Sequence, residues 1–586
     1  MFRFIKQHKF IFLLVGTLFV FHLLSKDIRS PYERPIAGDA QAYYAYLPAI
    51  FIYDDLDYQF METHAAQYYA PGHLKDFVNE VDGEKVNKTF PGVTVLYSPF
   101  FFFAHVHALI AGKPADGFST IYQFWFDVGF WIYFLFSLIF AKKILEKLRF
   151  DSKTILFSIF TIVLATNIFF YTVYDQSVTH IYNLFLINGL ILCLLNFKEK
   201  QQHKWLVIAL FLFALIGITR PTNILIVGLV LFFIPDVNFY KQLFKTVFSV
   251  HIWKFILLPL IVFFIPFALW KMQTGNWVVY SYGEEGFDFK NPYFFDFLWS
   301  YTKGWMTYTP IVVPLLLIGF WQLLKRSKPQ FVIGLVFYLG CIYIFSSWWC
   351  WYYGAGMSQR VMIDHYILLL FLGCLSIEWL TEQPIRKYVA SAGIALFGFL
   401  NIAQAYQIKT GIIQFGSATK EQYWDNFLSF QKKARVYPKM HWKEQENINF
   451  YLKSPQKGEN YIKNEKGFET FINSENTYST VFGQECNTIG NSSKLILSFE
   501  AKADQKIMNS RAVVSLYEKK TEAASTFVFY FEELLHADEW TLMEFLIEPQ
   551  NIFSNYVELF FWNGNSNEQI TFRNFKLTHY TTTEYM

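Results

Sequence analysis

The chain has 586 residues, of which 53% are hydrophobic, 21% aromatic and only 17% charged, with a formal net charge of +3. Its 68 phenylalanines exceed what a soluble core needs, and many apolar runs approach the roughly 20 residues that cross a bilayer. The charge and the lack of a basic tail give no indication of nucleic-acid binding, and five cysteines without a CxxC spacing argue against a metal site or a disulfide framework. The composition predicts a polytopic helical membrane protein.

The first apolar segment follows three basic residues, Arg3, Lys6 and Lys9. Its sequence, "LLVGTLFVFHLLSKDIRS", has no small-x-small cleavage site, so we interpret it as a retained anchor and not as a signal peptide.

Apolar runs predict eleven spans along the chain. They lie at about 9–25, 119–140, 154–173, 179–197, 204–219, 221–235, 253–270, 309–324, 330–347, 363–380 and 387–404. The basic clusters "AKKILEKLRFDSK", "KEKQQHK", "KQLFK", "KRSK" and "IRK" fall on alternate connections, which gives one consistent cytoplasmic face under the positive-inside rule. The sequence therefore predicts a cytoplasmic (inner) membrane protein with its N-terminus inside and its C-terminal domain outside.

One further apolar segment, residues 93–112, does not fit this pattern. Counting it as a span would invert every later loop and place the basic clusters outside. We interpret it as a membrane-surface or re-entrant helix within a long first outer loop, residues 26–118.

After residue 405 the long apolar runs end. Residues 406–439 are predicted as an amphipathic connector, and residues 440–586 alternate apolar and polar positions between Asn, Gly, Ser and Asp turns. This pattern is typical of an antiparallel β-sandwich. The predicted fold is a helical membrane domain, residues 1–405, followed by an all-β, jelly-roll-like domain.

The unusual polar residues gather on the predicted outer face. They are Asp39, Lys88, Asp175, His180, Arg220, Glu284, Glu285 and Arg360. Charges near a bilayer are costly unless they face a cavity or a partner, so several on one side suggest a shared polar site.

Four features occur in order along residues 1–405. These are an acid just after the first span, a "K-x-x-P-G" element (Lys88, Pro91, Gly92), "TRPT" at an outer helix end, and "WYYGAG" before Arg360. In layout the chain resembles the GT-C glycosyltransferases, which include protein O-mannosyltransferases and the aminoarabinose transferases of lipid A.

The resemblance implies transfer of a sugar from a polyprenyl phosphate to an acceptor, with inversion and without a cofactor; a divalent cation is not indicated. Such a reaction needs a carboxylate to take the acceptor's proton and cations to stabilise the departing phosphate. Asp39 fits the base, and Lys88, Arg220 and Arg360 fit the phosphate-binding cations. The aromatic residues that fit a sugar or lipid lining are Tyr43, Tyr44, Trp348, Trp349 and Trp351.

Each assignment has an alternative. Asp39 is also suited to cap the helix that follows it, and Arg220 to extend from a span end to the interface. The tryptophans fit an interfacial aromatic belt. Asp175, His180 and the Glu284–Glu285 pair are secondary polar candidates, the pair as ligands of an acceptor or a divalent ion.

Two other functions share much of this pattern: a carrier or flippase of lipid-linked saccharide, and a polymerase or ligase of glycan chains. A carrier is expected to show pseudo-symmetric halves and polar residues near the middle of the bilayer. The expected partners are the bilayer, a polyprenyl-phosphate sugar and a glycan, lipid or protein acceptor. Residues 440–586 resemble the jelly-roll carbohydrate-binding modules, with a structural or acceptor-docking role as the alternative, and we expect no catalysis there.

Overall fold

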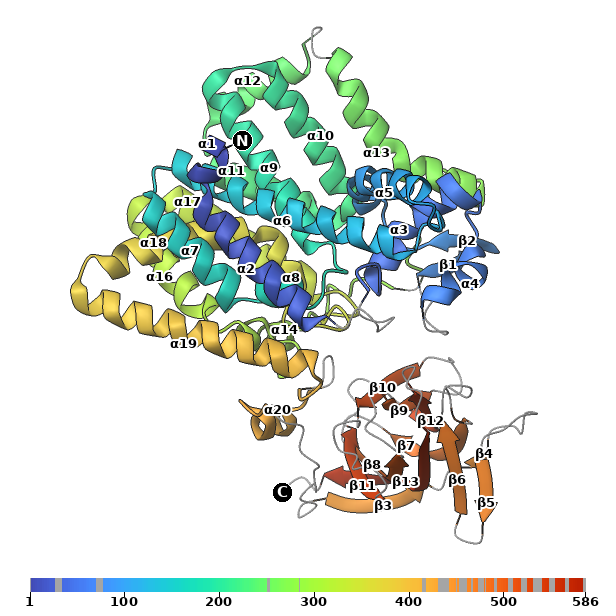
Figure 1. The fold of residues 1–586 in the computed structure, drawn as a ribbon. Helices are drawn as coiled ribbons and strands as arrows, with labels where there is room; N and C mark the ends of the chain where they lie inside the picture. The colour runs from blue at the N-terminus through green and yellow to red at the C-terminus, as the bar shows by residue number, and fades with distance from the viewer. Residues whose placement is uncertain are drawn as a thin grey trace. The chain divides into compact units, whose positions relative to one another are not determined.

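The computed structural model describes residues 2–26, 34–69, 77–249, 253–283, 285–413 and 418–430, together with separate stretches between 442 and 582. The chain divides into two compact units, Met1–Lys409 and Thr410–Met586. The first is mostly helical and the second carries the long β-strands (Figure 1). The finer boundaries at 405 and 440 stay predictions.

The helical unit is built from the following elements. They are α1 (Phe2–Gln7), α2 (Lys9–Ser25), α3 (Asp39–Pro48), η1 (Ala49–Tyr53), α4 (Phe60–Thr63), η2 (Ala65–Tyr68), β1 (Val78–Val81), β2 (Glu84–Asn87), α5 (Gly92–Ile110), α6 (Thr120–Lys147), α7 (Ser152–Ala165), α8 (Ile168–Val173), α9 (His180–Lys200), α10 (His203–Thr219), η3 (Pro221–Leu225), α11 (Ile226–Phe233), α12 (Val237–Val247), α13 (Trp253–Thr274), α14 (Phe294–Trp299), α15 (Trp305–Tyr308), α16 (Val312–Arg326), α17 (Lys328–Ser346), η4 (Arg360–His365), α18 (Tyr366–Thr381) and α19 (Pro384–Lys409).

Long apolar helices dominate this unit. In the part of the chain that the structure describes, seven helices are long and apolar enough to cross a membrane, judged by length and composition. They are Gly92–Ile110, Thr120–Lys147, His180–Lys200, Ile256–Thr274, Lys328–Ser346, Arg360–Thr381 and Pro384–Lys409. Four apolar helices are shorter, namely Lys9–Ser25, Ser152–Ala165, His203–Thr219 and Pro221–Phe233. The predicted class, a helical chain consistent with a membrane protein, is confirmed, whereas the count of eleven spans stays a prediction.

The segment that did not fit the predicted topology forms α5. This helix has 19 residues and meets the length and composition of a span. One side packs against α6, where the Tyr133 hydroxyl donates to the carbonyl of Leu96 at 2.7 Å, and the other exposes Phe103 and Ile110. Length and composition do not separate a crossing helix from a surface helix, so its placement in the first outer loop stays a prediction.

Local sequence signals explain where several helices begin and end. The side chain of Asp151 caps α7 by accepting from the backbone amides of Lys153 and Thr154 at 2.8 and 3.1 Å. The predicted span 154–173 is interrupted between α7 and α8. There Asn401 of α19 donates to the carbonyls of Leu164 and Thr166 at 3.0 and 2.8 Å, which replaces helical bonds lost at the break.

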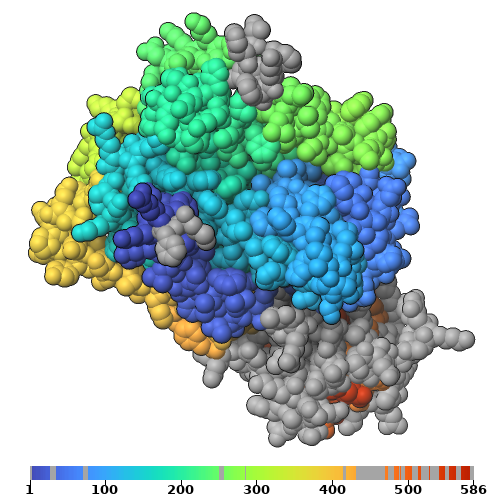
Figure 2. Space-filling view, turned by 45° about the horizontal axis from the view of Figure 1, so that its top comes forward, coloured from blue at the N-terminus to red at the C-terminus, as the bar shows by residue number. Residues whose placement is uncertain are grey.

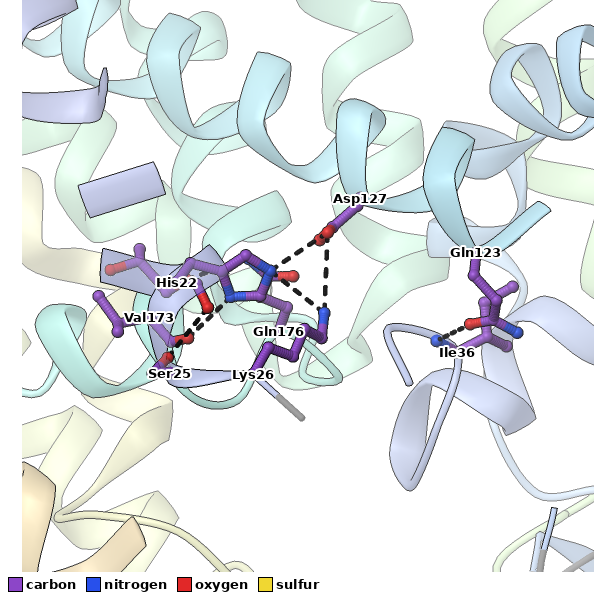
Figure 3. A network of polar contacts seen from close by, with 9 residues as sticks. His22, Ser25, Lys26, Ile36, Gln123, Asp127, Val173 and Gln176 are labelled. Atoms are coloured by element: carbon purple, nitrogen blue, oxygen red, sulfur yellow. Dashed lines mark hydrogen bonds and ion pairs between the residues drawn. The ribbon is translucent and has the colours of Figure 1, made fainter. Parts of the chain in front are cut away.

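The N-terminal helix α2 is fastened to two neighbours by one buried histidine (Figure 3). His22 Nδ1 bonds the carbonyl of Val173 in α8 at 2.8 Å, and its Nε2 lies 3.2 Å from Asp127 Oδ2 in α6. Lys26 lies 3.7 Å from the same carboxylate. The opposite side of α2 exposes apolar side chains, including Leu13 and Leu24, and Figure 2 shows this dark-blue segment at the surface of the unit. A helix bonded inward through its polar residues and apolar outward suits a lipid environment.

The second unit contains a short helix, α20 (Lys420–Asn426), and two antiparallel sheets. One sheet has the strand order β10-β9-β12-β7-β4 and the other β11-β8-β13-β6-β5, with β3 also pairing β13. Their bounds are β3 (Trp442–Ile448), β4 (Tyr451–Leu452), β5 (Tyr461–Asn464), β6 (Gly467–Ile472), β7 (Phe482–Ile489), β8 (Ser493–Ala503), β9 (Ser510–Tyr517), β10 (Ala524–Tyr530), β11 (Thr541–Ile547), β12 (Ser554–Asn563) and β13 (Ile570–Thr582).

Alternating side chains of both sheets form one buried apolar cluster. Phe499 of β8 packs against Phe561 of β12 with ring centroids 4.9 Å apart, and Phe561 stacks on Phe572 of β13 at 3.9 Å. The buried positions alternate along the strands, as the period-two pattern after residue 440 requires of a β-strand. The C-terminal β-sheet region is confirmed.

Candidate functional site

Asp39 and Arg360, predicted from opposite ends of the helical unit's sequence, are in direct contact. Arg360 Nη2 donates to Asp39 Oδ2 at 2.8 Å. The Asp39 side chain is 43% exposed and that of Arg360 14% exposed, so the carboxylate is accessible while the guanidinium is largely enclosed. Asp39 is the first residue of α3, where a negative charge also suits the helix dipole. The Asp39 carboxylate therefore pairs with Arg360 in addition to stabilising the start of its own helix.

The position of Asp39 is fixed by bonds between α3 and residues 87–89. Asn87 Nδ2 donates to the carbonyl of Ala42 at 2.8 Å, and the Tyr46 hydroxyl donates to the carbonyl of Thr89 at 2.9 Å. Lys88 lies between these two partners in sequence. The same bonds therefore hold both Asp39 and the Lys88 element in place.

The "K-x-x-P-G" element meets the "TRPT" element at Gly92. A Cβ added at Gly92 would lie 2.1 Å from Thr219 Oγ1 and 2.6 Å from the Thr219 backbone. Only glycine lets α5 begin so close to the end of α10, directly before Arg220. Two motifs far apart in the sequence are thereby parts of one junction.

Arg360 is carried by a loop with an uncommon backbone. Tyr353, Gly354, Gly356 and Ser358 all have positive φ, between 53° and 113°. A Cβ at Gly356 would lie 2.5 Å from the Tyr171 hydroxyl oxygen, so glycine is required there for space as well as for conformation. Such backbone clusters at functional sites.

Arg220 belongs to a buried polar network centred on Asp364. Arg220 Nη1 lies 3.1 Å from His180 Nε2, and His180 Nδ1 lies 2.6 Å from Asp364 Oδ1. These contacts require a ring that donates from Nδ1 to the carboxylate and accepts from the arginine at Nε2. The guanidinium also lies over the Tyr353 ring, 5.8 Å from its centroid.

Two asparagines complete this network. Asn183 Nδ2 and Asn223 Nδ2 donate to Asp364 Oδ2 at 2.9 and 2.8 Å. Asp364 is 1% exposed and both asparagines are fully buried. Asn183 follows His180 by three residues in α9, which places both side chains on one face of that helix. A buried carboxylate with three donors is well satisfied, and here it orients Arg220 through His180.

Tyr43 links the two clusters. The ionisable groups that influence the pKa of its hydroxyl electrostatically are Asp39, Tyr282, Arg220 and Arg360. Burial raises the pKa of Tyr43 well above its usual range, and the Asp39 carboxylate acts in the same direction. Tyr43 is therefore a neutral hydroxyl that can donate or accept a hydrogen bond between Arg220 and the Asp39–Arg360 pair.

Lys88 contacts the segment that follows α13. Its Nζ lies 3.4 Å from Glu285 Oε1, and both side chains are partly exposed. The Ser281 hydroxyl donates to the carbonyl of Lys88 at 3.0 Å. Burial raises the pKa of Tyr282, the neighbour of Ser281, and Arg220, Glu285 and Asp39 all act on it. Lys88 and Glu285 therefore border the same region.

The remaining predicted residues differ in where they lie. Asp175 Oδ1 accepts hydrogen bonds from the backbone amide and the hydroxyl of Ser177. Its carboxylate also interacts electrostatically with Arg360. Trp348 packs edge-on to Tyr282 at 5.8 Å, and Trp349 is 52% exposed. Trp351 is buried and stacks on Tyr293 at 6.0 Å.

The structure places Tyr44 inside the apolar core. It is 2% exposed, and its hydroxyl donates to the carbonyl of Gly117 at 2.6 Å. Its ring packs among Tyr97, Phe101 and Phe126. Glu284 falls outside the described residues.

One cation near the site was not among the predicted residues. Lys303 precedes α15, and the groups that act on it include Arg360, Asp175 and Asp39. The adjoining Trp305 fixes this segment: its Nε1 donates to the Tyr366 hydroxyl at 3.0 Å, and its carbonyl accepts from Ser358 Oγ at 3.3 Å. Lys303 shares its predicted outer connection, residues 271–308, with Lys271 and Lys290, so no signal in the sequence singled it out.

Within the described residues, no group of three or more His, Cys, Asp or Glu side chains is placed to hold a metal ion. The candidate site is an arrangement of acids, arginines, lysines and tyrosines.

Neither the models of known protein families nor the curated proteins match this chain. Among solved structures, the chain is similar to a family 16 carbohydrate-binding module, at 16% identity over 21% of this chain and 88% of that chain, with a TM-score of 0.17.

Proposed function

We propose that the protein transfers a sugar from a polyprenyl-phosphate donor to an acceptor on the outer face of a cytoplasmic membrane, inverting the anomeric carbon. In this reaction the acceptor hydroxyl or amine bonds to the anomeric carbon, and its proton passes to the carboxylate of Asp39. The bond from that carbon to the phosphate oxygen breaks, and the electron pair leaves with the lipid phosphate.

The observation that carries the proposal is the contact of the accessible Asp39 carboxylate with the enclosed Arg360 guanidinium at 2.8 Å. In an inverting transfer the base and the phosphate-binding cation lie on opposite sides of one anomeric carbon, so the Asp39–Arg360 pair has to separate when the donor and acceptor enter between the two groups. Arg220 and Lys88 border the same region and supply further positive charge for the departing phosphate. Tyr43 offers a neutral hydroxyl to the sugar.

The test is turnover of polyprenyl-phosphate-linked sugars by the purified full-length protein. Asp39→Asn keeps the size of the side chain but cannot take the proton, so transfer should fall roughly 10²–10⁴-fold. Asp57→Asn is the matched control, because Asp57 is an exposed acid of the same outer loop. Full turnover in the Asp39 variant would remove Asp39 from the mechanism. Donor that crosses the membrane without cleavage would instead favour a carrier or flippase, and extension of a glycan chain would favour a polymerase.

For the second unit we propose an accessory β-sandwich of the jelly-roll type, outside the membrane and without catalysis of its own. The support is that two antiparallel sheets share one apolar core. Trp562 is 6% exposed and belongs to the interior, whereas the Trp540 ring lies under the Arg573 guanidinium at 3.7 Å. A glycan would therefore have to displace Arg573 to stack on Trp540.

A further inference from the structure

Lys303 is buried without a partner. It is 1% exposed, and across the described residues its Nζ has no hydrogen-bond partner and no carboxylate within 4 Å. A buried ammonium without a counter-ion is strongly unfavourable, so a buried lysine without a partner beside other charged groups is a candidate for binding a ligand. The segment is held firmly by Trp305 and Tyr366, so Lys303 has not simply been left in a loose loop.

The groups around Lys303 are those of the candidate site. Burial lowers the pKa of Lys303 well below its usual range, and repulsion from Arg360 acts in the same direction. Asp175 and Asp39 oppose these effects from a distance, and Cys350 is the remaining neighbour. Both acids already have closer partners, Ser177 for Asp175 and Arg360 for Asp39.

Arg360 also has bonding capacity left over. Its Nη2 bonds Asp39, but its Nε is buried and has no hydrogen-bond partner among the described residues. A guanidinium binds a phosphate most strongly through two parallel N–H donors, so a phosphate that takes the free Nε also calls on the terminal nitrogens that now bond Asp39. Two neighbouring cations, each with an unused buried donor, are the complement of an oxyanion with several acceptor oxygens.

We infer that Lys303 and Arg360 together form a subsite for a phosphate group, and that this phosphate competes with Asp39 for the Arg360 guanidinium. The inference rests on the proposed function in taking the lipid-linked phosphate as the natural occupant. Filling the subsite draws Arg360 away from Asp39, and the carboxylate is then free to meet the acceptor. The phosphate-bearing lipid accordingly binds before the acceptor is activated.

Binding of farnesyl phosphate to the full-length protein in detergent tests the subsite. Lys303→Met should weaken this binding roughly 10–100-fold, the usual effect of losing a hydrogen bond to a charged group. Lys290→Met is the matched control, because Lys290 is an exposed lysine of the preceding loop, and it should bind as the native protein does. Farnesol, which lacks the phosphate, should bind both variants equally.

Inorganic phosphate distinguishes the source of the anion. If it binds with the same dependence on Lys303, the subsite accepts free phosphate; if only farnesyl phosphate binds, the subsite is specific for a lipid headgroup. Asp39→Asn should bind farnesyl phosphate at least as tightly as the native protein, because Arg360 then has no competing carboxylate. Weaker binding by Asp39→Asn would overturn the competition, and unchanged binding by Lys303→Met would overturn the subsite.

A second measurement covers the case in which Lys303→Met does not fold. Between pH 7.5 and 9.5 farnesyl phosphate is already a dianion, so a change of affinity reports the protein. Affinity should fall as pH rises, because the buried amine must gain a proton to pair with the phosphate. Lys303→Arg stays charged and should lose this dependence; a native profile in that variant would contradict the inference. Sugar turnover is measured separately: Lys303-dependent binding without turnover refutes the proposed function and leaves the subsite standing.

Discussion

Two clusters of the helical unit are made of the same kinds of residue and differ in how completely they are bonded. Around Asp364, two asparagines and His180 occupy both carboxylate oxygens, and the acid is 1% exposed. Around Arg360, one bond links it to a 43% exposed Asp39, while its Nε and the nearby Lys303 Nζ have none among the described residues. The first cluster has the character of a permanent support because its carboxylate is fully bonded, although the amide oxygens of Asn183 and Asn223 have no partner among the described residues. The second cluster leaves cationic donors that an anionic ligand can use.

The largest effect is expected when the permanent support is broken. In Asp364→Asn the new amide group would face donors from Asn183, Asn223 or His180, and at least one of these would lose its acceptor. Breaking a buried charged network in this way costs roughly 3–5 kcal/mol of unfolding free energy. Chemical denaturation of the purified protein measures this difference.

Glu378→Gln serves as the control for Asp364→Asn. Glu378 lies on α18, the helix that follows Asp364, and forms an exposed pair with Arg326 at 2.6 Å. Its loss should cost no more than about 1 kcal/mol. Equal effects of the two substitutions would show that burial does not distinguish the clusters.

The second cluster should respond in turnover more than in stability. Arg360→Lys keeps the charge but replaces the planar fork by a point charge, so the amine cannot offer a phosphate the two parallel N–H donors of a guanidinium. We expect sugar transfer to fall roughly 10–100-fold, about 1.4–2.7 kcal/mol of transition-state stabilisation. Arg326→Lys, in an exposed pair, should retain full turnover. If the two arginine variants behave alike, fork geometry at Arg360 has no role.

The smallest effect is a pH dependence of stability that belongs to Lys303. Burial lowers its pKa in the folded state, so between that value and about 10.4 the unfolded chain binds more protons than the folded protein. Stability should therefore rise with pH in this window, by at most about 1.4 kcal/mol per pH unit. Thermal unfolding of Lys303→Met without ligand should lack this pH dependence of stability. If the pH dependence is the same as in the native protein, the Lys303 ammonium is solvated in the folded state and not buried.

The sequence predicted the helices better than it predicted which polar residues would be in contact. Asp39 with Arg360, and His180 with Arg220, are in contact because loops at one end of a bundle converge. Asp364 was overlooked although it falls within a predicted span, where an ionisable residue is itself a functional signal. Asn183 and Asn223 could not be singled out, because an asparagine in an apolar helix looks the same in sequence whether it bonds a carboxylate or a carbonyl.

Aromatic residues were the least predictable. Tyr43 and Tyr44 are adjacent in sequence, yet they have different surroundings. Tyr43 interacts electrostatically with the charged groups of the site, and Tyr44 is packed among Tyr97 and Phe101. Successive helical residues point about 100° apart, and the sequence does not reveal which direction meets the core. The β character of the second unit was easier to predict from its period-two alternation, but the alternation alone did not tell which face of each strand is buried.

The loop that carries Arg360 has a consequence for the entropy of binding. Two of its residues, Tyr353 and Ser358, hold positive-φ conformations that a residue other than glycine seldom samples in an unfolded chain, and Gly354 and Gly356 each give up a wide conformational freedom. The cost of selecting those conformations falls on folding, before any ligand is present. An anion that meets Arg360 therefore encounters a guanidinium whose backbone is already ordered, and little of its binding energy is spent on immobilising the loop.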